Sequence, residues 1–374
     1  MNPRRRSARR AAWLLTLALV VTPAIAAAYP QYTLSRQTTC AACHVSPAGS
    51  GLLDGMGEVT AEEDASWGGD GRFLSGRVEL PEWLKAGGDF RFAGGASDKG
   101  AGIGGAAFPM QLEGYAAATK GAVTGYATLG LVRPNEDSPA SVIQTREHWV
   151  MYRPSAEEGY YVRAGRFQPV YGLRLSEHVF YVRRYGGAQL YGETYGVNAG
   201  WVSDSVEAHV TGFIKDPLRD SSELGNGAAI YVEKRLGQEA AVGAQARYAK
   251  SDLDTRAQAG LTGKLWIPCA DLLLQAEAGI TQQDFDAGSG RTQLTSQLLA
   301  SWFFKRGFFL DVGVGQYNAD LSLKYQDRTA VDANLHWFPS AHWELVLMGR
   351  VQTIGFGNGG PGSGFTLLQV HYRL

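Results

Sequence analysis

The chain has 374 residues, and its 35 lysines and arginines nearly balance its 36 aspartates and glutamates. This balance excludes the strongly basic surface that nucleic-acid-binding proteins need, so no nucleic-acid partner is expected. The length suits one large domain or two small ones, and three cysteines are too few for a disulfide framework.

The first 28 residues predict a secretory signal peptide. Five arginines lie between positions 4 and 10, an apolar run follows from Ala11 to about Val21, and small residues lead to Ala28. We expect Sec-dependent export and cleavage just before Tyr29. No other stretch has ~18 unbroken apolar residues, so no transmembrane helix is expected in the mature chain.

Cys40, Cys43 and His44 form the sequence C-x-x-C-H, which attaches c-type haem. In such sites the two thiols add to the haem vinyl groups and the histidine becomes an axial iron ligand. A zinc site is disfavoured because no second C-x-x-C or H-x-x-x-H completes it. The motif therefore predicts one covalent haem c, attached in the periplasm. Cys269 is then single, and we interpret it as a turn residue.

Residues 29–80 form the predicted monohaem cytochrome c segment. These roughly fifty residues are rich in glycine, alanine and serine, and they are too few to bury a haem well on their own. The segment is therefore expected to fold against the rest of the chain.

Residues 81–374 predict an outer-membrane β-barrel, an all-β fold of about 16 antiparallel strands. Apolar and polar side chains alternate over segments of about ten residues, long enough to span the ~25 Å apolar band when tilted. The expected strands are 84–93, 107–118, 121–132, 145–154, 158–167, 191–201, 205–214, 227–236, 239–250, 254–266, 270–283, 291–304, 307–318, 327–338, 341–352 and 363–374.

The connections between these segments alternate between short and long. Longer links are expected at 94–106, 133–144, 168–190, 215–226, 284–290, 319–326 and 353–362. Short periplasmic turns and long external loops are typical of outer-membrane barrels. Tyr152, Trp266 and Trp337 each stand close before a proline turn, which predicts a periplasmic aromatic girdle. The competing fold, a soluble sandwich or propeller, needs no such order of loops.

A sixteen-stranded barrel has a lumen wide enough for a plug. We therefore expect the haem segment to enter the lumen from the periplasmic end and to carry the haem inside. The link 168–190 could fold inward, as porin constriction loops do.

The second axial ligand is open at this stage. His178, in the link 168–190, ranks first and Met348 second, while Met56, His209, His336 and His371 are further candidates. A haem iron with an open sixth coordination position would favour the binding of small ligands instead of electron transfer. Most lumen histidines are simply hydrated polar residues.

Charged side chains allow two further interpretations. The arginines around the link could neutralise haem propionates or line an anion-selective constriction: Arg163, Arg166, Arg174, Arg183 and Arg184. Acidic residues in the expected external loops could attract Fe(II) or Mn(II), could bridge divalent ions on lipopolysaccharide, or could simply keep the loops soluble: Asp98, Glu136, Asp137, Asp216, Asp220, Glu223, Asp252, Asp254, Asp284, Asp286 and Asp320.

The stretch Pro30-Gln31-Tyr32, then Arg36-Gln37-Thr38 and the motif from Cys40 to His44, followed by a barrel, resembles the fused porin–cytochromes of the outer membrane. The best-known members are iron oxidases, which take electrons from external Fe(II). Residues 44–52 are more similar to uncharacterised monohaem barrels. The resemblance covers the haem segment, and the barrel is similar only in architecture.

These observations lead to a main hypothesis and two alternatives. The main hypothesis is an outer-membrane electron conduit, in which one haem moves electrons between an extracellular donor, Fe(II) above all, and a periplasmic c-type cytochrome or other carrier. The first alternative is a diffusion porin with a haem-bearing plug or sensor segment. The second is a haem enzyme acting on peroxide or nitric oxide. No nucleophile elbow, phosphate loop or H-E-x-x-H occurs in the sequence.

Overall fold

The computed structural model describes residues 30–49, 51–98, 100, 102–131, 143–156, 158–217, 225–355 and 360–374. The predicted signal peptide, residues 1–28, lies outside this part of the chain. No helix in the described ranges has both the length and the apolar character needed to cross a membrane.

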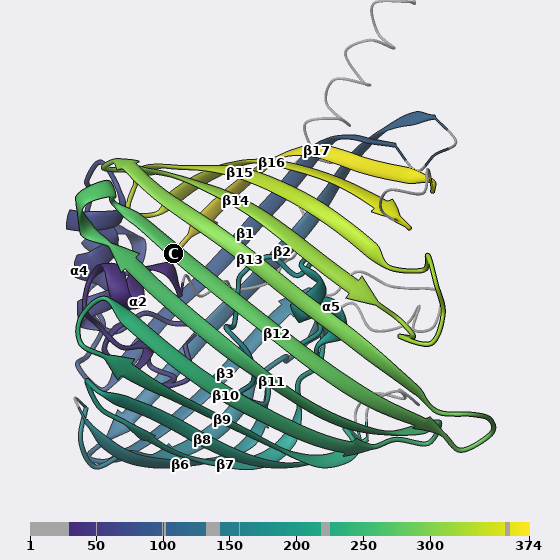
Figure 1. Ribbon diagram of the computed structural model, residues 1–374. Helices are drawn as coiled ribbons and strands as arrows, with labels where there is room; N and C mark the ends of the chain where they lie inside the picture. The colour runs from purple at the N-terminus through teal and green to yellow at the C-terminus, as the bar shows by residue number, and fades with distance from the viewer. Residues whose placement is uncertain are drawn as a thin grey trace, which may run out of the picture.

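The described residues form a closed antiparallel barrel (Figure 1). Each strand pairs with the next along the chain, and the first pairs with the last from Asp89 opposite Arg373 to Asp98 opposite Gly364. The strands are β1 (Leu84–Asp98), β2 (Ile103–Lys120), β3 (Val123–Leu131), β4 (Ile143–Gln144), β5 (His148–Tyr152), β6 (Gly159–Phe167), β7 (Thr194–Val202), β8 (Val206–Ile214), β9 (Asn226–Leu236), β10 (Ala240–Lys250), β11 (Asp254–Ile267), β12 (Leu272–Phe285), β13 (Arg291–Lys305), β14 (Phe308–Asn318), β15 (Arg328–Ser340), β16 (Trp343–Ile354) and β17 (Gly362–Arg373).

The predicted sixteen-stranded barrel is confirmed within the described residues. β4 and β5 both pair with β3, so together they fill one position in the wall. The link expected at 94–106 differs, because β1 and β2 continue as a paired hairpin as far as Asp98 and Ile103. Its glycines and alanines carry little side-chain bulk, and the backbone ladder simply extends through them.

Alternation of side chains separates the two faces of the wall. On β15, Asp332 and His336 point inward and are 2% and 1% exposed, whereas Val331 is 51% exposed on the outside. β16 repeats the pattern, with Glu344 buried and Leu347 exposed. An apolar outer face and a polar lining are what a lipid-embedded barrel requires. Trp266 is an exception to the expected girdle, because it is buried against Leu34.

The link between β6 and β7 folds into the lumen, as expected. It carries the short helix α5 (Tyr181–Tyr185), which contacts β13 and β14 on another part of the wall. Leu173, Phe180 and Val182 of this link pack with Leu299 of β13. We call residues 168–193 the inward loop. Its apolar side chains are buried against the wall, so the loop occupies lumen space.

The N-terminal segment lies at the end of the barrel where the short turns gather (Figure 1). It contains α2 (Gln31–Ser35), α3 (Cys40–Cys43), α4 (Gly55–Val59), a π-helical turn η1 (Thr60–Ala65) and a 3₁₀ turn η2 (Phe73–Gly76). Ala41, Val45 and Leu52 pack with the inward side chains of Tyr126 and Trp149. The segment is therefore in direct contact with the inner surface of the wall.

Candidate haem site and lumen

The three motif residues are brought together by one helical turn. Thr39 caps α3, its hydroxyl accepting a hydrogen bond of 3.2 Å from the amide of Ala42. The amide of His44 donates to the carbonyl of Cys40 at 2.9 Å and closes the turn. Residues three apart on a helix share a face, so Cys40 and Cys43 are placed on one side of α3.

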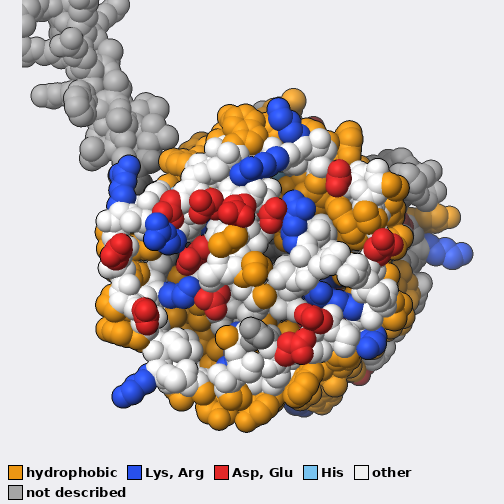
Figure 2. Space-filling view, turned by 90° about the vertical axis from the view of Figure 1, so that its left-hand side faces the viewer, with side chains coloured by type: hydrophobic (Ala, Val, Ile, Leu, Met, Phe, Trp, Pro, Cys, Tyr) orange, Lys and Arg blue, Asp and Glu red, His pale blue; other side chains and the backbone are white. Residues whose placement is uncertain are grey.

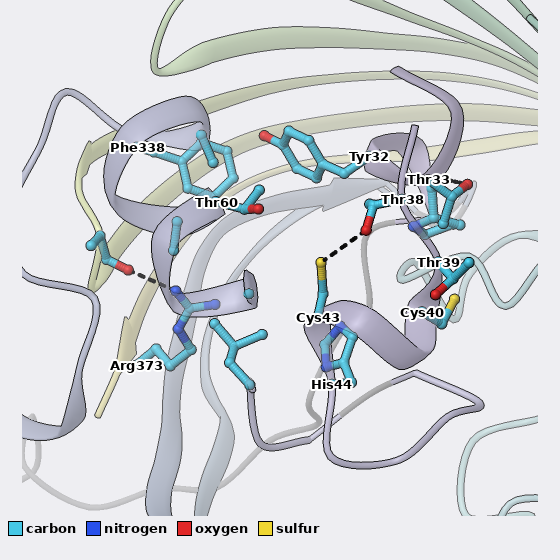
Figure 3. A pocket seen from close by; sticks show the side chains of 16 residues that line it. Tyr32, Thr33, Thr38, Thr39, Cys40, Cys43, His44, Thr60, Phe338 and Arg373 are labelled. Atoms are coloured by element: carbon cyan, nitrogen blue, oxygen red, sulfur yellow. Dashed lines mark hydrogen bonds between the residues drawn. The ribbon is translucent and has the colours of Figure 1, made fainter. Parts of the chain in front are cut away.

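Both cysteines and His44 line one cavity (Figure 3). The cavity and the space at its open mouth together measure about 740 Å³. The barrel contributes residues from strand ends beside short turns: Phe338, Ala341 and Arg373. Tyr32, Leu53, Thr60 and Ala61 complete much of the lining from the segment. The sulfur of Cys43 lies 3.8 Å from the hydroxyl of Thr38 (Figure 3).

The chemistry of these groups fits haem c. Burial, reinforced by the positive charge of Arg373, lowers the pKa of His44 to about 4, so its ring is neutral at pH 7 and able to bind iron. Burial also raises the pKa of the Cys40 and Cys43 thiols. A haem would be held by Cys40 and Cys43 through thioethers and by His44 through the iron.

A glycine makes the cavity possible. Gly57 of α4 lies so close to α3 that a Cβ atom there would overlap the backbone carbonyl of Cys43. The amide of Asp54 donates to that same carbonyl at 2.8 Å, and the side chain of Asp54 caps α4. The two short helices therefore pack backbone to backbone beside the cavity, a contact that only glycine allows at position 57.

Polar contacts tie the segment to the wall along its length. Most are donated by barrel side chains to backbone carbonyls of the segment. The contacts to backbone carbonyls are Arg153 to Ala41 (3.3 Å), Arg174 to Ala48 (2.9 Å), Arg306 to Ser66 (2.7 Å) and His342 with Asp70 (2.7 Å). Two further hydrogen bonds join side chains, from Gln31 to Asp311 (3.2 Å) and from Arg163 to Ser46 (3.0 Å).

The predicted second ligands lie elsewhere. His178 is in the inward loop, where burial and then the charge of Arg183 lower its pKa to about 4. Met348 is buried on the inner face of β16, and Met56 is more than half exposed. Within the described ranges, His44 is the only histidine or methionine lining the cavity. The assignment of His178 or Met348 as distal ligand stays a prediction.

Two of the other candidate histidines belong to a buried polar row that sequence reasoning missed. His371 bonds to Asp89 at 2.7 Å and to Glu344 at 2.9 Å, and Glu344 bonds to His336 at 2.8 Å. These residues come from β1, β15, β16 and β17. Their inward parity was visible in the alternation, but their adjacency required the closure of β17 on β1.

The arginines of the expected cluster bind different groups. Arg166 pairs with Asp216 at 2.8 Å, and Arg174 pairs with Glu207 at 2.7 Å. None of the five lines the cysteine cavity. Three of them, Arg163, Arg174 and Arg183, instead line a second cavity beside residues 46–49.

The acidic loop residues do not assemble a metal site within the described part of the chain. No group of three or more histidine, cysteine or carboxylate side chains there could hold a metal ion. Asp252 pairs with Lys215, and Asp254 pairs with Arg256. Glu136, Asp137, Asp220 and Glu223 lie outside the described residues.

Comparison with known proteins shows the fold alone. No protein-family model matches the sequence, and the search of curated proteins found no relative. Among solved structures, the chain is similar to an anion-selective porin from Comamonas acidovorans, with a TM-score of 0.62, 13% identity, and coverage of 78% of this chain and 99% of that one.

Two further solved structures have a similar fold. Outer-membrane expressed OmpT of Vibrio cholerae gives a TM-score of 0.59 at 13% identity, covering 80% of this chain and 100% of that one. Salmonella typhi OmpF in complex with daunomycin gives 0.58 at 11% identity, covering 79% and 100%. The chain has the sixteen-stranded antiparallel barrel fold of these porins.

Proposed function

We propose that this barrel carries one covalent haem c and moves electrons between an extracellular donor and a periplasmic carrier. The observation that carries the proposal is the meeting of Cys40, Cys43 and His44 at one cavity between the segment and the barrel. Bound there, haem would supply a one-electron Fe(III)/Fe(II) couple. The cavity fits the motif's chemistry, because two thiols and a neutral imidazole are what haem c attachment needs.

The surrounding residues would orient and shield the group. Tyr32, Leu53 and Phe338 give the cavity apolar walls that exclude water, and burial of this kind is one determinant of a haem potential. Arg373 is the positive side chain in the lining, suited to a propionate carboxylate. The segment would thus act as a plug that holds the haem against the wall.

The position of the cavity suits exchange with a periplasmic partner. It lies at the short-turn end, which faces the periplasm in outer-membrane barrels. Aspartate and glutamate side chains form a row across this face of the molecule, with lysine and arginine side chains among them (Figure 2). Glu63, Asp64 and Glu79 of the segment are exposed, as is Glu82 just before β1. A periplasmic cytochrome with a basic surface would be attracted to such a face.

The position of the cavity at the short-turn end also limits which external donors can reach the haem. β12 has 14 residues, which span about 35 Å along the barrel axis at ~3.3 Å per residue and a tilt of about 40°. A donor that stayed outside would be far from a haem at the opposite end. The donor must therefore enter the lumen as a small solute, and Fe(II) or a small iron complex meets this requirement.

A diffusion channel is the second candidate, and the likeness to porins favours it. In this reading the inward loop narrows the lumen and the N-terminal segment acts as a plug or sensor. Solute passage would then be the main role, with or without haem.

One set of measurements separates the two functions. The full chain, produced in a host that attaches haem c and sealed into vesicles, should show the visible spectrum of covalently bound haem c. A membrane-impermeant Fe(II) complex added outside should reduce it. Protein without covalent haem, or haem that such a reductant cannot reach, would overturn the conduit. Liposome swelling by small sugars, equal with and without haem, would support the channel.

A further inference from the structure

A second cavity lies between three parts of the molecule that are distant in sequence. Residues 46–49 of the N-terminal segment, the inward loop and the inner wall enclose about 690 Å³, including the space at its mouth. Its charged lining within the described residues consists of four arginines and two glutamates: Arg146, Arg163, Arg174, Arg183, Glu147 and Glu193. The lining therefore carries an excess of positive charge.

Two of these arginines have a carboxylate partner, and two do not. Arg146 pairs with Glu193, and Arg174 pairs with Glu207. Arg163 and Arg183 form no ion pair with any described residue. Arg163 is 2% exposed, and its Nη1 donates to the hydroxyl of Ser46 at 3.0 Å.

The guanidinium groups of these arginines also have N–H donors without a hydrogen-bond acceptor among the described groups. The Nε atoms of Arg146, Arg163, Arg174 and Arg183 are buried and have no hydrogen-bond partner among the described groups. Arg183 uses its Nη1 on the backbone carbonyl of Leu175. A buried guanidinium without an anion is costly, because its lost hydration is not replaced by a charge of opposite sign.

We propose that this cavity binds a small oxyanion, either an inorganic phosphate or a carboxylate of similar size that enters through the lumen. The planar fork of arginine matches the geometry of phosphate and carboxylate oxygens, and charge-assisted hydrogen bonds of this kind are among the strongest in proteins. Arg163 and Arg183 supply positive charge that no ion pair holds, and nearby carboxylates, Glu147 beside Arg163 and Glu177 beside Arg183, offset only part of it. This site is independent of the proposed haem.

The N-terminal segment completes the site. The hydroxyl of Ser46 accepts a hydrogen bond from Arg163, and the carbonyl of Ala48 accepts a hydrogen bond of 2.9 Å from Arg174. These contacts aim two guanidinium groups from different elements at the same space. The anion would thus bind only when the segment is seated, and bound anion would stabilise the seated segment in turn.

The test is a calorimetric titration of the purified full-length protein in detergent with inorganic phosphate. Wild-type protein should bind phosphate, and both Arg163→Gln and Arg183→Gln should weaken binding by at least about tenfold, since each removes a charged fork. Arg184→Gln is the matched control. Arg184 follows Arg183 in α5 but does not line the cavity, so its loss should leave the affinity unchanged.

Three outcomes would overturn the proposal. They are no phosphate binding by wild-type protein, unchanged binding in Arg163→Gln, and an equal loss in Arg184→Gln, which would indicate a diffuse field instead of a site. If Arg163→Gln does not fold, Arg163→Lys keeps the charge but not the fork, and it should weaken binding to a smaller degree.

The haem carries carboxylates of the same chemistry, so a further variant distinguishes the sources. Cys40→Ala/Cys43→Ala, which lacks the attachment thiols, should bind phosphate as tightly as wild-type protein. Phosphate binding that appears only in this haem-free variant would show that haem propionates fill the cavity, and the free-anion proposal would then be wrong.

Discussion

The barrel wall and the N-terminal segment are held in place in different ways. The wall is one closed ladder in which every strand except the two-residue β4 is paired on both sides, so the wall is built from repeated backbone hydrogen bonds. The segment has five short helical turns and is tied to the wall by scattered side-chain contacts such as those of Arg153, Arg174 and Gln31. The wall should therefore tolerate changes in the segment, whereas the segment depends on the wall.

The largest effect is expected from removing the attachment thiols. Cys40→Ala/Cys43→Ala should abolish covalent haem completely, while the barrel keeps its strand content. Haem staining of the denatured protein and far-ultraviolet circular dichroism measure the two properties. A haem-stained band from the double variant, or none from wild-type protein made in a haem-attaching host, would contradict the proposed site.

A charge on the lipid face should damage the wall itself. Leu347 is about half exposed near the middle of β16, and Leu347→Lys should lower the free energy of unfolding by about 2–4 kcal/mol because the ammonium would face hydrocarbon. Urea unfolding in lipid vesicles measures this change. Leu347→Ile, the control, should cost under ~1.5 kcal/mol. Equal effects of the two variants would argue against a lipid-facing position.

A substitution at Gly57 should destabilise the segment and leave the wall intact. Gly57→Ala should push α4 away from Cys43 and destabilise the segment by about 1–3 kcal/mol, as overpacking usually does. Gly55→Ala is the matched control, because a Cβ at position 55 meets nothing within 4 Å. Limited proteolysis should cut the segment faster in Gly57→Ala only. Faster cleavage within the barrel strands would contradict the separation of the two regions.

The smallest effect concerns one contact between the regions. Gln31 is fully buried and donates to Asp311 at 3.2 Å, so Gln31→Ala should destabilise the seated segment by about 1 kcal/mol. Gln37→Asn changes an exposed glutamine in the same segment and should have little effect. Hydrogen exchange of the segment amides distinguishes the two variants. The idea fails if Gln31→Ala leaves that exchange unchanged.

Local patterns predicted the wall well for a physical reason. Strand alternation, turn residues and loop length are all properties of short stretches, and they identified β15 and β16 with the correct inward and outward faces. Trp266 was placed wrongly in the outer girdle, because it takes an inward position on β11 and packs with Leu34 of the segment. The inward fold of the link 168–190 was foreseen, but not which wall strands it would contact.

The sequence by itself determined that the chain has a C-x-x-C-H motif at residues 40–44 and about sixteen strands of alternating side chains, because both depend on short-range spacing. Tertiary structure alone decided which inward side chains meet. Closing β17 against β1 placed His371 between Asp89 and Glu344, and seating residues 46–49 placed Arg163 and Arg174 around one cavity. Such meetings depend on contacts between residues far apart in the chain, which no local pattern encodes.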